Sequence, residues 1–300
     1  MQPQVFPHPA FPAHALLDSG GGEKLERFGE VILRRPDPQA LWRRRRPDAD
    51  WASADLAFVR ESDRGGRWEA RAGSPAELRK PSPEWRIEHQ GARFWIRPTA
   101  FKHVGIFPEQ ASNWDWIERV RRKLGPGEPR LLNLFGYTGA ASVLAAQAGW
   151  NVTHVDASKQ SLGWLRENLV ASELDERAVR VILDDALAFA QREVRRGRTY
   201  HAILLDPPHY GRGPKGETWR LEEGLAPLVE AAGALLEPRA ALVLSTYAVG
   251  YSPLAFANLL GELGAGAVEV GELAIPEEAT ERRLPAGFCA RFLRGLDLDS

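Results

Sequence analysis

Polar and glycine residues follow four successive segments rich in strand formers. The first segment leads into Asn133-Leu134-Phe135-Gly136-Tyr137-Thr138-Gly139-Ala140, whose two glycines permit a tight turn close to a ligand. The second ends at Asp156, where a carboxylate can accept hydrogen bonds from both hydroxyls of a ribose. The third leads into Asp184-Asp185-Ala186, where a carboxylate can accept from the exocyclic amine of an adenine. These residue types indicate a nucleoside-containing ligand.

The fourth segment leads into Asp206-Pro207-Pro208-His209-Tyr210. Two prolines directly after a buried strand remove two backbone donors and stiffen the loop, so that the aspartate and the following rings are aimed at one point. This arrangement favours a positioning role. The other signals also have structural explanations, because a glycine turn is common in α/β proteins and an aspartate can cap a helix. Asp184 could cap the helix beginning near Ala186, and Asp156 or Ser158 the helix beginning near Lys159.

The elements that must position these residues alternate between strand and helix. The expected strands are 130–135, 151–156, 179–183, 201–206 and 241–247, and the expected helices between them are 140–148, 159–171, 186–196 and 222–236. A further helix is expected over 252–263, and closing strands over 267–274 and 288–293, the last of them antiparallel. Continuous apolar strands in such an order predict an α/β fold with a mostly parallel, Rossmann-like sheet covered on both faces.

The chain before this sheet has a different character. Residues 1–15 carry four prolines and are expected to form an extended arm. Residues 16–106 hold short runs of strand formers, among them a hairpin over 85–88 and 93–97. We therefore expect a small antiparallel β-rich domain over 16–106 and a larger domain over 107–300, whose first helix begins near Ser112-Asn113.

Composition limits the class of protein and its partners. The formal charge of -1 divides into +5 over residues 1–125 and -6 over residues 126–300, and a basic front indicates a polyanionic partner such as RNA, or simply a solvated surface. No stretch approaches the roughly 20 apolar residues of a membrane span. A single cysteine, Cys289, allows no intrachain disulfide and no cysteine-rich metal site, so we expect no metal and a cytoplasmic protein.

Together, the four strand-end motifs resemble those of class I S-adenosylmethionine-dependent methyltransferases. More narrowly, the chain is similar to the bacterial ribosomal-RNA large-subunit methyltransferase-like group, which pairs an Asn-x-Phe-x-Tyr-Thr-Gly turn with an Asp-Pro-Pro loop. The segment Gly105-Ile106-Phe107-Pro108-Glu109-Gln110 also resembles that group. The resemblance covers residues 84–300 and leaves residues 1–83 unexplained.

The resemblance implies a role for each matched residue. It places around S-adenosylmethionine the residues Asn133, Phe135, Gly136, Tyr137, Thr138, Gly139, Ala140, Asp156, Ser158, Lys159, Asp185 and Ala186, with Asp206 at the methyl end. It implies that Asp206, Pro207, Pro208, His209 and Tyr210 face the methyl acceptor, with the two rings available to stack on a flipped base.

Cysteine usage bears on which atom receives the methyl group. Carbon 5 of a pyrimidine becomes nucleophilic only after a thiolate adds to the ring. The segment expected as the fifth strand reads Leu242-Val243-Leu244-Ser245-Thr246-Tyr247 and lacks cysteine, and Cys289 is expected to be a buried structural thiol. The sequence therefore favours a base nitrogen in RNA, with ribosomal RNA preferred.

Other functions remain open from the residues. An NAD-dependent oxidoreductase shares the glycine turn and the ribose-binding acid, but Gly-x-Gly-x-x-Gly is absent. A methyltransferase acting on protein or a small molecule, or a non-catalytic cofactor-binding module, also fits. Arginines and tryptophans of residues 25–106, including Arg43–Arg46, could form an RNA surface, or the tryptophans could build the core of the small domain.

Overall fold

The structure is a computed structural model that describes residues 4–62, 65–247 and 250–298. Its described residues divide into two compact units. The first unit comprises 4–7, 112–273 and 287–298, and the second comprises 8–111 and 274–286. The expected domain limits at 15/16 and 106/107 stay predictions, and each unit is described below by itself.

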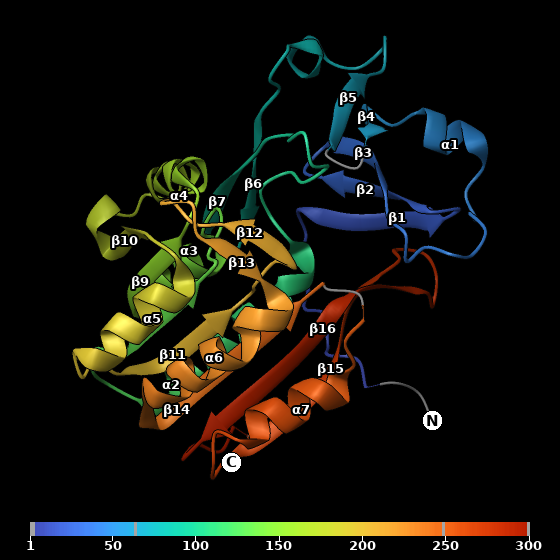
Figure 1. Ribbon diagram of the computed structural model, residues 1–300. Helices are drawn as coiled ribbons and strands as arrows, with labels where there is room; N and C mark the ends of the chain where they lie inside the picture. The colour runs from blue at the N-terminus through green and yellow to red at the C-terminus, as the bar shows by residue number, and fades with distance from the viewer. Residues whose placement is uncertain (1–3, 63–64, 248–249, 299–300) are drawn as a thin grey trace. The chain divides into compact units, whose positions relative to one another are not determined.

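The first unit is built on a seven-stranded sheet in the order β10-β9-β8-β11-β14-β16-β15 (Figure 1). Its strands are β8 (Arg130–Leu134), β9 (Asn151–Asp156), β10 (Val179–Leu183), β11 (Tyr200–Leu205), β14 (Leu236–Thr246), β15 (Ala267–Pro276) and β16 (Arg283–Arg294). Neighbours from β10 to β14 run parallel, and β16 is antiparallel to β14. The expected α/β fold with a mostly parallel sheet is confirmed.

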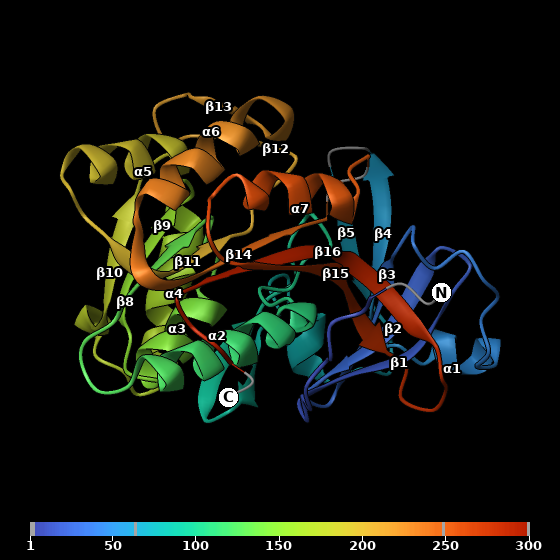
Figure 2. The same ribbon diagram turned by 90° about the horizontal axis from the view of Figure 1, so that it is seen from below.

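Helices cover both faces of this sheet. Figure 2 shows α2 (Ala111–Leu124), α3 (Ala140–Gln147) and α4 (Lys159–Ala171) on one side. On the other side lie α5 (Ala186–Arg195), α6 (Leu221–Ala234) and α7 (Pro253–Gly261). A short hairpin, β12 (Tyr210–Arg212) with β13 (Thr218–Arg220), follows β11. None of the helices in the described part of the chain is long and apolar enough to cross a membrane.

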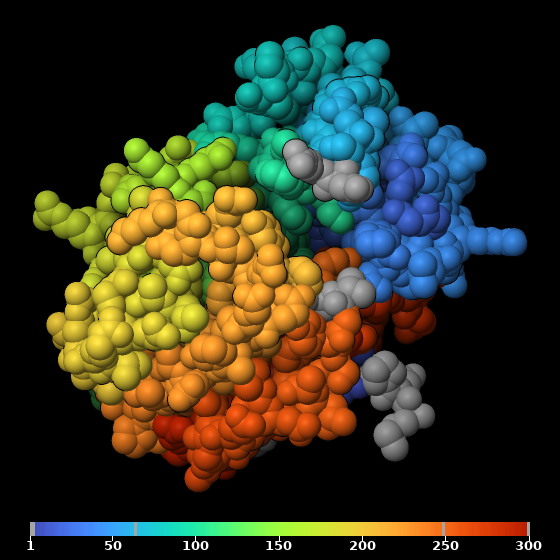
Figure 3. Space-filling model, in the orientation of Figure 1, coloured from blue at the N-terminus to red at the C-terminus, as the bar shows by residue number. Residues whose placement is uncertain are grey.

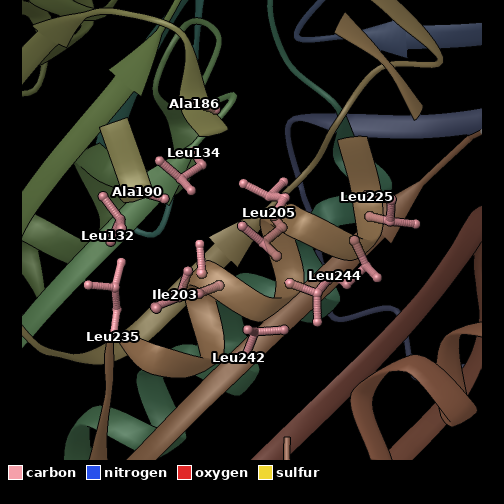
Figure 4. Close-up of a cluster of buried hydrophobic side chains, with 14 of the residues drawn as sticks. Leu132, Leu134, Ala186, Ala190, Ile203, Leu205, Leu225, Leu235, Leu242 and Leu244 are labelled. Atoms are coloured by element: carbon pink, nitrogen blue, oxygen red, sulfur yellow. The ribbon is translucent and has the colours of Figure 1, made fainter. Parts of the chain in front are cut away.

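The core beneath α5 and α6 explains why the strands are so apolar. Leu132, Leu134, Ile203, Leu205, Leu242 and Leu244 project from three adjacent strands toward Ala186, Ala190 and Leu225 of the covering helices (Figure 4). A strand buried on both faces needs apolar residues at consecutive positions, as residues 202–205 supply. This core holds the carboxyl ends of β8, β9, β10 and β11 in register at one edge, where the motifs lie.

The second unit contains a five-stranded sheet in the order β1-β2-β3-β4-β5 and a separate hairpin. Its strands are β1 (His14–Gly20), β2 (Glu23–Phe28), β3 (Val31–Pro36), β4 (Leu56–Ser62) and β5 (Gly65–Ala70), and the hairpin is β6 (Trp85–His89) with β7 (Ala92–Ile96). The short helices are α1 (Asp48–Ala52), η1 (Ala76–Arg79) and, leading to α2, η2 (Pro108–Gln110), while η3 (Glu176–Ala178) belongs to the first unit. The hairpin prediction is confirmed. The sheet is not wholly antiparallel as expected, because the connection through α1 brings β4 parallel to β3.

Candidate cofactor and substrate site

The turn between β8 and α3 has an unusual backbone. Phe135 and Tyr137 have φ angles of 58° and 52°, in the left-handed region that side chains disfavour by about 1–2 kcal/mol each. Gly139 has φ 85° and stands as N-cap of α3. Two strained non-glycine residues in one turn persist only where the surroundings hold them, and they concentrate at ligand-binding sites.

Buried side chains behind the turn hold this backbone in place. Asn133 Nδ2 donates to Ser142 Oγ at 3.0 Å, and Ser142 Oγ lies 2.9 Å from His154 Nδ1. The imidazole of His154 also packs under Gly136, where an added Cβ would come within 2.2 Å of its Cε1. Burial lowers the pKa of His154 to about 3, so the ring is neutral near pH 7. Glycine at 136 is therefore required by the close approach of a ring, not by φ.

Asp156 connects the end of β9 to the turn. Its Oδ2 accepts from the Tyr137 amide at 2.8 Å and its Oδ1 accepts from the Ser158 amide at 2.8 Å. Burial raises the pKa of the carboxyl group, while the two amides oppose that shift. None of the ion pairs found among the described residues includes Asp156. A half-buried carboxylate held by amides, with no cation on it, retains lone pairs for the hydroxyls of a ribose.

The other adenosine-side residues lie at the neighbouring helix starts. Ser158 is the N-cap of α4 and accepts from Ser161 at 3.1 Å, which confirms its alternative explanation as a cap, and the adjacent Lys159 is exposed. Asp185, rather than Asp184, caps α5 by accepting from Ala188 at 2.8 Å. Asp184 instead forms an ion pair with Arg192 and accepts from the Asp185 amide at 3.0 Å. The adenine contact of Asp185 and Ala186 stays a prediction.

The Asp206–Tyr210 loop is fastened from both sides. Ser245 Oγ on β14 donates to Asp206 Oδ1 at 3.0 Å, and Trp219 Nε1 on β13 donates to the Pro208 carbonyl at 2.7 Å. Pro207 is buried, while Asp206 and Pro208 are exposed. His209 is exposed and lies 2.9 Å from Glu222, and the Tyr210 side chain is 51% exposed. The loop thus presents one carboxylate and two rings to solvent beyond the sheet edge.

Cys289 lies beneath this edge but is not available for chemistry. It stands opposite Ser245 in the β14–β16 register, is fully buried and donates to Asn113 Oδ1 at 3.2 Å. Burial raises the pKa of the thiol to about 11. The expectation of a buried structural thiol matches these contacts. Among the described residues no group of His, Cys, Asp and Glu is placed to hold a metal ion.

The structure brings most of the predicted residues to one edge of the sheet. The glycine turn, Asp156, Asp184–Asp185 and Asp206 all follow carboxyl ends of four adjacent strands. Sequence reasoning missed Ser142, His154, Ser245 and Trp219, which hold these residues. Only Ser245 had a signal, since it stands at the carboxyl end of the fifth strand of the alternation, the kind of position where ligands bind in a parallel sheet.

Three comparisons place this arrangement among known proteins. The family model described as "Conserved hypothetical protein 95" matches residues 110–245. A crystal structure of a SAM-dependent methyltransferase from Agrobacterium tumefaciens is 39% identical, covers 97% of this chain and 93% of its own, and superimposes with a TM-score of 0.90. The chain belongs to the S-adenosylmethionine-dependent methyltransferases.

Two further matches are limited to the fold or to part of the chain. A putative methyltransferase solved in complex with SAH shares the fold, with 20% identity, a TM-score of 0.68, and coverage of 95% of this chain and 77% of its own. The ribosomal RNA large subunit methyltransferase K/L of Methylococcus capsulatus is 33% identical over 162 residues. The match covers 53% of this methyltransferase, which spans only 21% of that relative's length.

The observed residues fit the cofactor of the family. A half-buried carboxylate without an ion pair at Asp156 suits the ribose, and the left-handed turn places backbone next to the N-terminus of α3. The carboxylates of Asp156 and Asp206 also give this edge of the methyltransferase a negative character that suits a cationic sulfonium.

Proposed function

We propose that this protein is a cytoplasmic RNA methyltransferase that transfers the methyl group of S-adenosylmethionine to a base nitrogen, with ribosomal RNA the favoured substrate. The observation that carries the proposal is the fastened Asp206–Tyr210 loop. It sets a carboxylate, held at 3.0 Å by Ser245, beside two exposed rings. The K/L relative, named for ribosomal RNA, supports the choice of substrate.

The loop residues would orient the acceptor. Asp206 can accept a hydrogen bond from an amino or ring N–H and so turn the nitrogen lone pair toward the methyl group, a positioning role that needs no strong base. The Pro208 carbonyl accepts from Trp219, which fixes the second proline of the loop next to the carboxylate. His209 and Tyr210 can stack on a flipped base, which contributes about 1–3 kcal/mol per base.

The cofactor would lie between the glycine turn and Asp156. S-adenosylmethionine, when bound, supplies a methyl group on a positively charged sulfur. Residues Asn133–Ala140 would surround its methionine part, Asp156 would accept from its ribose hydroxyls, and Asp184 or Asp185 would accept from its adenine amine. Because Cys289 is the single cysteine and is buried with a pKa of about 11, addition of a thiolate to carbon 5 of a pyrimidine is not supported.

Labelled methyl transfer tests the acceptor. The full chain and labelled S-adenosylmethionine are incubated with one acceptor at a time: deproteinised ribosomal RNA, intact ribosomal subunits or cell protein. The labelled product is then identified by mass spectrometry. We expect label on a base nitrogen of ribosomal RNA, and none with the Asp206→Ala variant. Label in protein alone would overturn the RNA proposal in favour of a protein methyltransferase.

Calorimetry tests the cofactor separately. We expect S-adenosylmethionine to bind and NAD not to bind, and Asp156→Ala to abolish binding because the ribose loses its acceptor. Asp48→Ala, which removes an exposed carboxylate in the second unit, serves as a control for general effects of substitution. Binding of NAD in place of S-adenosylmethionine would instead favour an oxidoreductase.

A further inference from the structure

The β12–β13 hairpin has two unlike faces. Its register pairs Tyr210 with Arg220, Gly211 with Trp219, and Arg212 with Thr218. Directly opposed residues share a face and successive residues alternate, so Gly211 and Trp219 form one face. The other face carries the exposed residues Tyr210, Arg212, Thr218 and Arg220.

The inner face packs the hairpin against the glycine turn, the Asp206–Tyr210 loop and α6, all in the first unit. Trp219 is buried, packs against Phe135 with ring centroids 4.9 Å apart and donates to the Pro208 carbonyl. A Cβ on Gly224 of α6 would come within 2.5 Å of the Trp219 ring, so that glycine makes room for the indole. The hairpin therefore has a fixed position relative to the Asp206–Tyr210 loop.

The outer face carries exposed cations, and Arg212 and Lys215 among them form no ion pair with the described residues. The nearby Glu217 carboxylate is used within the turn, because its Oε2 accepts from the Lys215 amide at 2.8 Å. Backbone amides, and to a smaller extent the charge of Lys215, lower the pKa of this carboxyl group. Arg220, by contrast, pairs with Glu223 at 3.2 Å.

The turn that carries Lys215 is ordered by its own backbone. The Gly213 amide donates to the Glu217 carbonyl at 2.8 Å, and the Gly216 amide donates to the Gly213 carbonyl at 3.1 Å. A pre-ordered turn loses little conformational entropy when it binds a partner. In Figure 3 the amber part of the chain that includes the hairpin lies on the surface of the face shown.

We propose that this outer face is a binding surface for the sugar-phosphate backbone of the substrate RNA next to the nucleotide that is methylated. Arg212 and Lys215 would contact phosphates. Tyr210, which lies between Pro208 and Arg212 in the sequence, would stack on the target base or on a flanking base. The inference rests on the proposed function and adds a substrate-binding element to it. Phosphate contacts position an RNA without reading its sequence, so the hairpin fixes the register of the strand rather than its identity.

The test uses the Arg212→Ala/Lys215→Ala double variant of the full chain. Its matched control is Arg195→Ala/Arg198→Ala, which removes two exposed cations near the amino ends of the strands, opposite the site. Binding of a fluorescein-labelled single-stranded RNA is measured over a series of salt concentrations. Steady-state methylation of deproteinised ribosomal RNA and calorimetry with S-adenosylmethionine are measured in parallel.

Loss of two phosphate contacts should reduce the slope of log K against log salt by about 1.4, since each contact on a single strand contributes about 0.7. We expect KM for the RNA to rise while kcat and the affinity for S-adenosylmethionine stay at wild-type values, and the control to behave as wild type. An unchanged slope and KM, or an equal change in the control, would overturn the hairpin surface while RNA methylation stands. Failure of the wild type to methylate RNA would overturn the proposed function and this inference together.

Discussion

Cys289 shows how an environment decides what a reactive residue type can do. Its thiol is fully buried, donates to Asn113 and has a pKa of about 11, so the thiolate fraction near pH 8 is about one in a thousand. Cys289 is therefore a packing residue beside the end of β14, whose Ser245 holds Asp206. Its polar partner, Asn113 Oδ1, also accepts from Arg291 at 3.1 Å.

We expect Cys289→Ser to retain methyl transfer. A serine hydroxyl can donate to the same Asn113 oxygen, and no step needs a thiolate at this position. The measurement is kcat with labelled cofactor, with calorimetry as the check on cofactor binding. Complete loss of turnover with cofactor binding intact would assign the thiol a catalytic role and contradict this interpretation.

At the scale of elements, the loop after β11 depends on the indole of Trp219. Trp219→Phe keeps the ring against Phe135 but removes the donor to the Pro208 carbonyl. A hydrogen bond of this kind is worth about 0.5–1.5 kcal/mol, which corresponds to about a 2- to 12-fold fall in kcat if the loop is then misplaced. The affinity for S-adenosylmethionine should not change, because the glycine turn and Asp156 are held by other groups.

Trp68→Phe is the matched control for this substitution. Its indole on β5 also donates to a backbone carbonyl, that of Thr99, at 2.8 Å, but in the second unit. Thermal unfolding of both variants separates lost stability from lost positioning. An equal fall in kcat for the two variants would show that the effect is not specific to the loop.

The elements that could be predicted from the sequence are those whose burial is apolar. The bounds of β9, β10 and α4 match the expected ranges, because apolar strands alternate with helices whose starts carry a capping side chain such as Ser158. β2 was missed because its core positions include a charge: Glu26 is fully buried and paired with Arg35 at 2.6 Å. A hydrophobic pattern assigns such a residue to the surface.

The candidate site divides in the same way. Asp156 and Asp206 could be found because they directly follow strands, and local order in the chain fixes that position. Trp219 and Ser245 could not be assigned their roles, since Trp219 acts on a carbonyl 11 residues away and Ser245 on a carboxylate 39 residues away. Such partners become neighbours only when the sheet order is known.

For the whole molecule, two histidines that burial keeps neutral make the free energy of unfolding depend on pH. Burial lowers the pKa of His154 in the first unit and of His103 in the second unit to about 3, from an ordinary value of 6.5. Below pH 6.5 the unfolded chain binds these protons and the folded chain does not. The free energy of unfolding therefore has its full value above about pH 6.5 and falls as the pH decreases toward 3.

We expect each histidine to contribute a slope of about 1.4 kcal/mol per pH unit between about pH 4 and pH 6, since one proton is then bound on unfolding. Replacing either ring with a group that does not titrate, as in His154→Gln or His103→Gln, should reduce the slope by that amount, whatever the variant's stability near pH 7. Urea unfolding at several pH values measures the slope. A variant with the wild-type slope would show that its imidazole already binds a proton in the folded chain. For His154, the full burial of the ring under Gly136 and beside Ser142 opposes that charge.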